Sequence, residues 1–143
     1  MIYIQAPEEV WFPSKKSIFL AGGISNCTNW QPNVAKWFIN TDLVVVNPRR
    51  EDFTNCSSTQ QIIWEFERLK KSDIILFWFP PETVCPITLY ELGAWAGRKP
   101  IIVGCHRDYS RKLDLEVQLG LKNTPVHVGM TNFKHAVFDY LDV

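Results

Sequence analysis

The stretch Asp73-Ile74-Ile75-Leu76-Phe77-Trp78-Phe79-Pro80-Pro81 decides the fold class of this chain. Its apolar residues follow one another without polar alternation, and two prolines end the run. A short apolar run of this kind is typical of a strand that is buried on both faces of a parallel sheet. The next segment, residues 86–97, has a proline in its first turn and a glycine at its end, as helices do. Together the two segments predict one strand–helix unit of an α/β sheet.

Further strand-like runs lie on both sides of this unit, at residues 18–21, 43–46, 101–105 and 126–128. Helical patterns alternate with them at residues 59–71, 113–121 and 131–141, with Thr59 and Thr131 as N-caps and Gly120 near a helix end. This alternation predicts a parallel sheet of five core strands with flanking helices. No repeat, low-complexity tract or long linker divides the chain, so we expect one domain over residues 1–143.

Two segments carry additional expectations. Residues 1–5 are also strand-like, but Pro7 and Pro13 separate them from the alternation, so we expect an edge strand or an extension there. In the helix predicted at residues 59–71, the spacing gives one apolar face. Its members are Ile62, Ile63, Phe66 and Leu69.

Composition argues against several classes of function. Fifteen Lys plus Arg balance fifteen Asp plus Glu, so the chain has no general attraction for nucleic acid or an acidic membrane. No run approaches the eighteen or so apolar residues of a membrane span, and the first residues do not resemble a signal peptide. The four cysteines form no C-x-x-C pair, and the three histidines lack metal-ligand spacing with them. We therefore expect a cytoplasmic protein with reduced thiols, no metal, and no membrane or nucleic-acid partner.

Open parallel sheets bind ligands beyond the carboxyl ends of their strands, where the strand order reverses. This rule selects the loops at residues 22–30, 47–55, 80–86 and 106–112. Gly22 and Gly23 lack the spacing of a dinucleotide-binding or P-loop motif, and taken alone such a pair is typical of a chain reversal with positive φ. A flavodoxin-like phosphate loop formed by Ser25 and Thr28, with flavin mononucleotide as ligand, stays an alternative.

Five pieces of sequence occur in a characteristic order. They are Ser17-Ile18-Phe19-Leu20-Ala21-Gly22-Gly23, Asn47-Pro48-Arg49-Arg50, the run from Asp73 to Pro81, Thr88-Leu89-Tyr90-Glu91-Leu92-Gly93, and residues 104–114. In this order the chain resembles the nucleoside 2-deoxyribosyltransferase family, in particular its short phage- and bacteria-type relatives, over about residues 17–128. The resemblance implies a flavodoxin-like, doubly wound α/β fold. It also implies transfer or hydrolysis at the anomeric carbon of a deoxyribose, and a homodimer or larger homo-oligomer with shared sites.

The resemblance assigns roles to particular residues. The family's nucleophilic glutamate corresponds to Glu91, and an active-site aspartate near the base and sugar corresponds to Asp73. A polar residue after a D-Y pair is donated to the neighbouring subunit's site. Here Asp108-Tyr109, followed by Asp114, take that place.

Two positions depart from the family's pattern. Phe19 stands where the transferases carry an aromatic hydroxyl. Cys85, six positions before Glu91, stands where the transferases place an aspartate for the nucleobase and the nucleotide-hydrolysing relatives a serine for phosphate. The resemblance therefore indicates N-glycosidic chemistry without deciding the base, the phosphate state or the acceptor.

The residue types themselves fit this chemistry. A carboxylate beneath the anomeric carbon can trap an oxocarbenium-like transition state as a covalent glycosyl intermediate. Glu91, about five residues into its helix, suits that role, and a solvated helical glutamate is the alternative. Asp73 would hold a water or protonate the departing base, and its alternative is to cap the preceding helix or to pair with Lys70 or Lys71.

Other candidates lie at the predicted ligand edge. Arg49 and Arg50 either bind a phosphate or a base edge, or are ordinary exposed arginines. Trp30 and Trp78 either stack on a base or sugar or belong to the core. The predicted substrate-binding set consists of Gly22, Gly23, Trp30, Asn47, Arg49, Arg50 and Asp114.

We therefore expect an enzyme that cleaves or transfers at the N-glycosidic bond of a nucleoside or nucleotide, using neither metal nor organic cofactor. Its partner would be that small molecule rather than a nucleic-acid polymer. A module of the same fold that senses or sequesters a nucleotide with little catalysis is the first alternative. A flavin-binding flavodoxin relative is the second.

Overall fold

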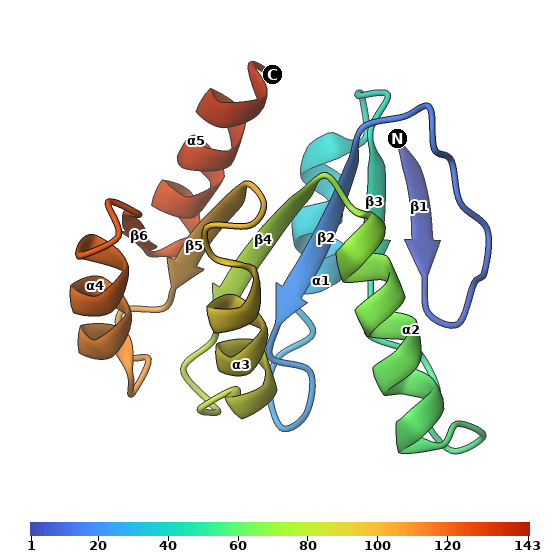
Figure 1. Ribbon diagram of the computed structural model, residues 1–143, viewed down its shortest axis with the longest axis horizontal. Helices are drawn as coiled ribbons and strands as arrows, with labels where there is room; N and C mark the ends of the chain where they lie inside the picture. The colour runs from blue at the N-terminus through green and yellow to red at the C-terminus, as the bar shows by residue number, and fades with distance from the viewer. The chain divides into compact units, whose positions relative to one another are not determined.

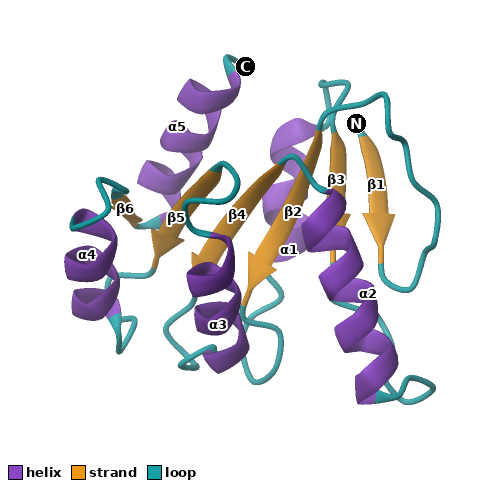
Figure 2. Cartoon of the chain, viewed as in Figure 1, coloured by secondary structure: helices purple, strands orange, loops and turns teal.

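The computed structural model describes all 143 residues and contains a six-stranded sheet and five α-helices (Figure 1). The strands are β1 (Ile2–Gln5), β2 (Ser17–Gly22), β3 (Val44–Asn47), β4 (Ile74–Phe79), β5 (Ile101–Cys105) and β6 (Val126–Val128). The helices are α1 (Gln31–Ala35), α2 (Ser58–Lys71), α3 (Pro86–Trp95), α4 (Lys112–Gly120) and α5 (Met130–Leu141), with a 3-10 helix at Lys36–Phe38 (Figure 2). None of these helices has the length and apolar character that crossing a membrane requires.

The sheet confirms the predicted flavodoxin-like α/β class. Its strand order is β1-β3-β2-β4-β5-β6. Without β1, this corresponds to the 2-1-3-4-5 order of flavodoxin-like sheets. The N-terminal segment is an edge strand, because β1 pairs in parallel with β3 from Ile2 beside Val44 to Gln5 beside Asn47. The runs predicted at 101–105 and 126–128 coincide with β5 and β6, and the other core strands differ by a single residue at one or both ends.

Two compact units make up the chain. Unit 1 comprises Met1–Leu20 and Asn29–Ile75, and unit 2 comprises Ala21–Thr28 and Leu76–Val143. Unit 1 holds β1, β3, α1 and α2, whereas unit 2 holds β5, β6 and the helices α3, α4 and α5. A single domain over residues 1–143 stays a prediction.

The core of unit 1 is built on β3. Val44, Val45 and Val46 are all buried, and β3 pairs in parallel with β1 and with β2. A continuous β-branched run is what a strand covered on both faces requires. Behind β3 in Figure 1 lies α1, a helix that was not predicted from the sequence. Pro32 in its first turn is the local signal that indicates it.

The segment between β1 and β2 packs along α2. The guanidinium of Arg68, which is only 1% exposed, lies 5.6 Å from the ring centroid of Trp11 and 5.3 Å from that of Trp64. Arg68 Nη2 and Trp64 Nε1 each donate to the carbonyl oxygen of Glu8 at 3.0 Å. The two aromatic faces and this carbonyl stabilise a cation that burial has removed from water.

The apolar face predicted for α2 does not meet the core, although such a face usually does. Its exposed members are Ile62 (62%), Ile63 (53%) and Phe66 (59%). Only Leu69 of the predicted set is buried, together with Trp64 and Arg68. Trp64 and Arg68, four residues apart, share one side of the helix. Their packing under the segment after β1 sets the rotation of α2 and carries the isoleucines and Phe66 outward.

Both predicted N-caps are wrong. Ser57, not Thr59, caps α2: its hydroxyl accepts from the Gln60 N–H at 3.1 Å, and the Gln60 side chain accepts from the Ser57 N–H at 3.0 Å. This reciprocal pair satisfies two helix-end donors, which a cap at Thr59 would leave unpaired. Gly129, with φ of +90°, precedes α5, and Thr131 lies inside that helix.

In unit 2, α5 packs against β5 at a glycine. A Cβ on Gly104 would lie 2.6 Å from Cδ2 and Cγ of Phe133, so the absence of a side chain lets the ring approach. The Phe133 ring also lies 5.4 Å from the ring of Trp78, and both residues are buried. Trp78 therefore belongs to the core. In Figure 1, α3 lies in front of the sheet near the end of β4, α4 lies beside β6, and α5 lies behind β5.

Candidate active site

The strand order reverses between β2 and β4, and this switch point is where such sheets bind ligands. β2 ends at Gly22 and β4 ends at Phe79, so the loops at residues 23–28 and 80–85 form the carboxyl edge there. Both loops belong to unit 2. The carboxyl edge at the switch point therefore lies within one compact unit.

Gly23 allows these two loops to touch. A Cβ on Gly23 would lie 2.8 Å from Cγ of Pro80 and 3.0 Å from the sulfurs of Cys27 and Cys85. Neither Gly22 nor Gly23 has a positive φ, so a chain reversal of that kind does not explain the pair. Gly23 is required for space rather than for an unusual backbone conformation.

A hydrogen bond also joins the two loops. Thr28 Oγ1 donates to Glu82 Oε1 at 2.8 Å, and this bond is the main reason that the pKa of Glu82 is lowered. The charge of His106, the first residue after β5, lowers the pKa of Glu82 slightly further. The His106 N–H donates to the carbonyl oxygen of Phe79 at 2.9 Å. The ends of β2, β4 and β5 are thus connected around an ionised Glu82.

Cys85 occupies the N-cap position of α3 in the left-handed region, with φ of +56° and ψ of +59°. Such a conformation costs a non-glycine residue about 1–3 kcal/mol and is concentrated at functional sites. Burial raises the pKa of the Cys85 thiol to about 12, so the thiol is neutral at pH 7. Next to it, the Tyr109 hydroxyl donates to the Val84 carbonyl at 2.6 Å, and the Tyr109 ring lies 5.0 Å from that of Phe79. Cys85 therefore supplies an uncharged, weakly polar group to this turn.

Glu91 lies in the second turn of α3 and is half-buried. Thr88 and Leu92, four residues apart, are the buried positions of this helix, and Glu91 stands on the flank of that side. Because α3 begins directly after the loop at residues 80–85, its first two turns start from the switch-point edge. A carboxylate so placed is partly shielded from water, which strengthens its interaction with a developing positive charge.

In unit 1, the carboxyl end of β3 carries three more predicted residues. Asn47 is fully buried: its Nδ2 donates to the Tyr3 hydroxyl at 2.7 Å, and its Oδ1 accepts from the Arg49 N–H at 2.9 Å. Arg49 and Arg50 are both half-buried, and Arg50 Nε donates to Gln61 Oε1. The structure thus brings Asn47, Arg49 and Arg50 together in one loop, and Asn47 uses its amide to hold that loop.

Asp73 lies at the opposite edge of unit 1. Its Oδ2 accepts from the backbone N–H and the hydroxyl of Ser17 at 2.7 and 2.8 Å, and its own N–H donates to the Ser17 hydroxyl at 3.1 Å. Ser17 is beside Val44, the first residue of β3, and Asn47 is the last. Three residues of strand span about 10 Å. Unit 1 therefore does not bring Asp73 to Asn47, and an active-site role for Asp73 stays a prediction.

Trp30 is buried at the start of α1. It is 4% exposed, and its carbonyl accepts from the N–H groups of Asn33 and Val34 at 3.1 and 3.2 Å. Stacking on a base needs an accessible ring face. The burial of Trp30 therefore favours a role in the core over stacking on a base or sugar.

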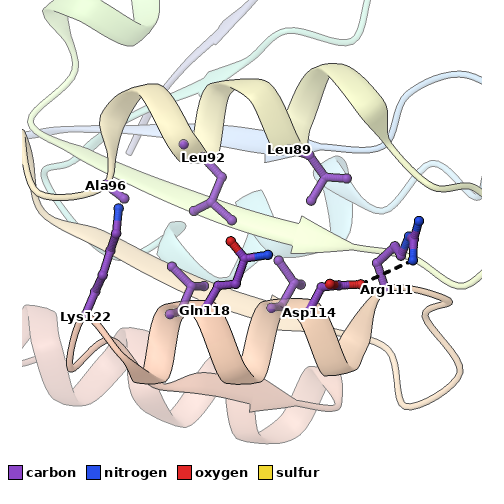
Figure 3. Close-up of a pocket in the computed structure, with 10 residues that line it drawn as sticks. Leu89, Leu92, Ala96, Arg111, Asp114, Gln118 and Lys122 are labelled. Atoms are coloured by element: carbon purple, nitrogen blue, oxygen red, sulfur yellow. Dashed lines mark hydrogen bonds and ion pairs between the residues drawn. The ribbon is translucent and has the colours of Figure 1, made fainter.

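A groove of about 370 Å³ separates α3 from α4 in unit 2 (Figure 3). Leu89 and Leu92 point into it from α3, and the α4 side carries Asp114, Gln118 and Lys122. Asp114 lies in the first turn of α4, 53% exposed, and makes an ion pair with Arg111 at 3.4 Å. The groove thus has an apolar floor and a rim that carries both signs of charge.

Several residues at these edges were missed by sequence reasoning. They are Tyr3, Gln5, Gln61 and Glu82. Gln61 left a local signal, because it and Glu65 are polar residues four apart in α2. Glu82 left none, because its partner Thr28, which the sequence suggested only as part of a phosphate loop, lies 54 positions away.

The fold defines a class: a flavodoxin-like α/β protein with a glutamate, Glu91, on the helix that follows the switch-point loop. A match to the family described as nucleoside 2-deoxyribosyltransferase like covers residues 15–109, about two thirds of the chain. The chain belongs to this nucleoside 2-deoxyribosyltransferase-like family, which confirms the resemblance found in its sequence. No curated protein matches the chain significantly. Family membership indicates glycosyl transfer on nucleosides; Asp73 and Glu91 lie inside the matched range and Asp114 lies outside it.

Proposed function

We propose that this protein cleaves or transfers at the N-glycosidic bond of a deoxynucleoside or deoxynucleotide through a covalent glycosyl–Glu91 intermediate. The observation that carries the proposal is the position of Glu91, a half-buried carboxylate on α3, the helix that starts from the switch-point loop. The family to which the chain belongs indicates chemistry on nucleosides. Neither a metal nor an organic cofactor takes part in the proposed steps.

In the first step the Glu91 carboxylate attacks C1′ of the sugar as the bond from C1′ to the base nitrogen breaks. The bonding electron pair leaves with the base, which takes up a proton from water or an acidic group. In the second step a water molecule or a second nucleobase attacks C1′, the ester to Glu91 breaks, and the carboxylate is restored. The incoming group loses one proton to solvent, so the two steps balance.

The environment of Cys85 supports a restricted set of base contacts. A neutral thiol cannot act as an anionic hydrogen-bond acceptor, and it is a weaker donor than a hydroxyl. Cys85 is also only 5% exposed and its sulfur packs against Gly23, so little of the thiol is accessible to a substrate. We therefore propose that this position gives the base no strong hydrogen bond. We also propose that the acceptor includes a second nucleobase, as in the transferases that the sequence resembles.

We also propose that the active assembly contains a second copy of the chain, with Asp114 donated to the neighbouring site. The support comes from α4, where Leu113, Val117 and Leu121 are 73%, 53% and 82% exposed at a spacing of four residues. Such a stripe beside an apolar-floored groove is unusual on a surface that faces only water. A partner seated there would lie next to Asp114 on the groove rim.

A binding module of the same fold is the second candidate. It is favoured by two positions where the resemblance leads one to expect polar contacts. Phe19 is 1% exposed and Cys85 is 5% exposed, so both serve packing here. A module of this kind would bind a nucleotide without turning it over.

One experiment separates the candidates. The purified protein is incubated with a panel of deoxynucleosides and their 5′-monophosphates, each with and without a second free base, and the products are resolved by chromatography. The proposed enzyme releases free base, and forms a new nucleoside when an acceptor base is present. Ligand-induced thermal stabilisation without base release would establish the binding module instead.

A further inference from the structure

Two cysteine sulfurs lie against Gly23 in unit 2. Cys27 belongs to the loop after β2, and Cys85 ends the loop after β4. A Cβ on Gly23 would lie 3.0 Å from the sulfur of each cysteine, so the two sulfurs are no farther apart than twice that distance. Neither cysteine is in a disulfide in this structure. Because the sulfurs of a disulfide are about 2 Å apart, rotation of the two side chains with a small movement of the loops would join them.

The residue type at position 85 is not explained by its backbone. Cys85 has φ of +56° and ψ of +59°, a left-handed conformation that glycine and asparagine adopt far more readily. Its S–H donates to the carbonyl oxygen of Thr83 at 3.6 Å, and a thiol is a weak donor. Little is therefore lost when this sulfur forms a bond elsewhere, and the thiol itself is the property that distinguishes a cysteine here.

The two thiols differ in access and in readiness to react. Cys27 is half-buried, whereas Cys85 is only 5% exposed. Burial, with smaller contributions from Cys27 and Glu82, raises the pKa of the Cys85 thiol to about 12. The thiolate is the reactive form of cysteine, so Cys85 stays a protonated thiol that a soluble oxidant attacks slowly. An oxidant therefore reaches Cys27 first, and Cys85 acts in a second step.

We propose that Cys27 and Cys85 are a redox-active pair, which hydrogen peroxide converts into a disulfide across the switch-point edge. In the first step the Cys27 sulfur attacks one peroxide oxygen and the O–O bond breaks, which gives a sulfenic acid and one water. In the second step the Cys85 sulfur attacks the Cys27 sulfur and the S–O bond breaks. The hydroxyl leaves with the Cys85 proton as a second water. Two thiols are thus oxidised to one disulfide while one peroxide is reduced to two waters.

The disulfide would also act on ligand binding, and this consequence rests on the proposed function. Cys85 directly precedes α3, the helix that carries Glu91, and Cys27 belongs to the opposite loop of the same edge. Joining the sulfurs draws the two loops together over Gly23, where the nucleoside is proposed to bind. We expect the oxidised protein to bind a deoxynucleoside about 10-fold or more weakly than the reduced protein, and reduction to restore binding.

The test counts and maps the thiols of the whole chain. Reduced, desalted protein is treated with a small excess of hydrogen peroxide, and the remaining thiols are alkylated in denaturant. Two of the four cysteines should escape alkylation, and a non-reduced peptide map should contain Cys27 joined to Cys85. Dithiothreitol should return all four. Cys56→Ser removes a half-buried thiol of unit 1 and is the matched control, which should form the disulfide as wild type does.

Single variants separate the two steps. Cys85→Ser should stop at the sulfenic acid, which dimedone traps on Cys27, and Cys27→Ser should leave Cys85 reduced. Four alkylated cysteines after peroxide treatment, a link from Cys27 to Cys56 or Cys105, or a disulfide between two chains would overturn the pair.

Ligand binding is measured on the same two forms of the wild-type protein by calorimetry. A mapped disulfide with equal affinity of both forms for the deoxynucleoside would overturn the effect on binding and support the pair as a modification site alone. Absence of deoxynucleoside binding and base release in the reduced protein would refute the proposed function, whereas the peptide map decides the pair independently of it.

Discussion

Asp73 and Ser17 form a reciprocal pair in which the carboxylate of Asp73 accepts from both the N–H and the hydroxyl of Ser17, at 2.7 and 2.8 Å. The pair joins the start of β2 to the residue before β4, at the amino edge of the strands. Asparagine at position 73 would keep an oxygen acceptor and lose the charge. We therefore expect Asp73→Asn to lower the free energy of unfolding by about 1–2 kcal/mol.

The same variant separates a structural from a catalytic role. If Asp73 acts only on the fold, base release by Asp73→Asn should stay within a few-fold of wild type at a temperature where both proteins are folded. Loss of a general acid would cost about 10²- to 10⁴-fold. Denaturant unfolding and base release, measured on one preparation, decide between the two.

Glu91 is expected to carry the sugar during turnover. Glu91→Gln keeps the size and hydrogen bonding of the side chain and removes the anionic nucleophile, so base release should fall by more than about 10⁴-fold with ligand binding retained. Wild-type protein quenched during turnover of a slow 2-fluoro-arabinosyl substrate should gain the mass of one sugar. Peptide mapping that places the adduct on another residue would refute the assignment.

Gly23 is expected to tolerate no side chain. Gly23→Ala places a methyl group 2.8 Å from the ring of Pro80 and 3.0 Å from two sulfurs, so the two switch-point loops must separate. We expect a loss of about 1–3 kcal/mol in the free energy of unfolding, with weaker nucleoside binding. Gly120→Ala in α4 is the matched control, because its methyl group meets nothing within 4 Å. Gly120→Ala should raise the free energy of unfolding by up to about 1 kcal/mol. Gly23→Ala behaving like this control would show that the loops yield freely.

Asp114 is expected to act across a subunit boundary. Inactive Glu91→Gln chains and inactive Asp114→Ala chains, mixed and allowed to exchange, should regain activity, because some sites then receive intact residues from both chains. For a two-site dimer with random exchange, about one quarter of wild-type activity is expected. Sedimentation at the assay concentration verifies the assembly. A fully active monomer, or no recovery after proven exchange, would contradict the shared site.

Glu65 should make stability depend on pH. Burial raises its pKa above the unfolded value, and the bond from Gln61 and the charge of Arg50 offset part of that shift. The folded state therefore binds more protons between the two pKa values, and the free energy of unfolding falls as pH rises through that interval. Glu65→Gln keeps an acceptor for Gln61, so it should be more stable than wild type at pH 7, with the advantage disappearing below about pH 4. Denaturant unfolding from pH 4 to 8, with the exposed Glu67→Gln as control, measures this; an advantage that is the same at every pH would contradict it.

The sequence by itself determined the elements that depend on local chemistry. The uninterrupted apolar run before Pro80 had to be a buried strand, and Pro86 had to open the helix that carries Glu91, because burial of apolar surface and the fixed φ of proline act within a few residues. The order of these elements predicted the flavodoxin-like class, and five sequence pieces in a characteristic order indicated the family.

Tertiary structure alone decided how these elements face one another. Ile62 and Phe66 have the spacing of a core face, yet Trp64 and Arg68 pack under the segment after β1 and turn α2 the other way. Periodicity specifies that a helix has an apolar side, but the neighbour that buries a given side is set by contacts between residues far apart in the chain. The same holds for Arg49, whose backbone is fixed by Gln5 from 44 positions away. A residue type indicates which bonds are available, and only the fold decides which partner forms them.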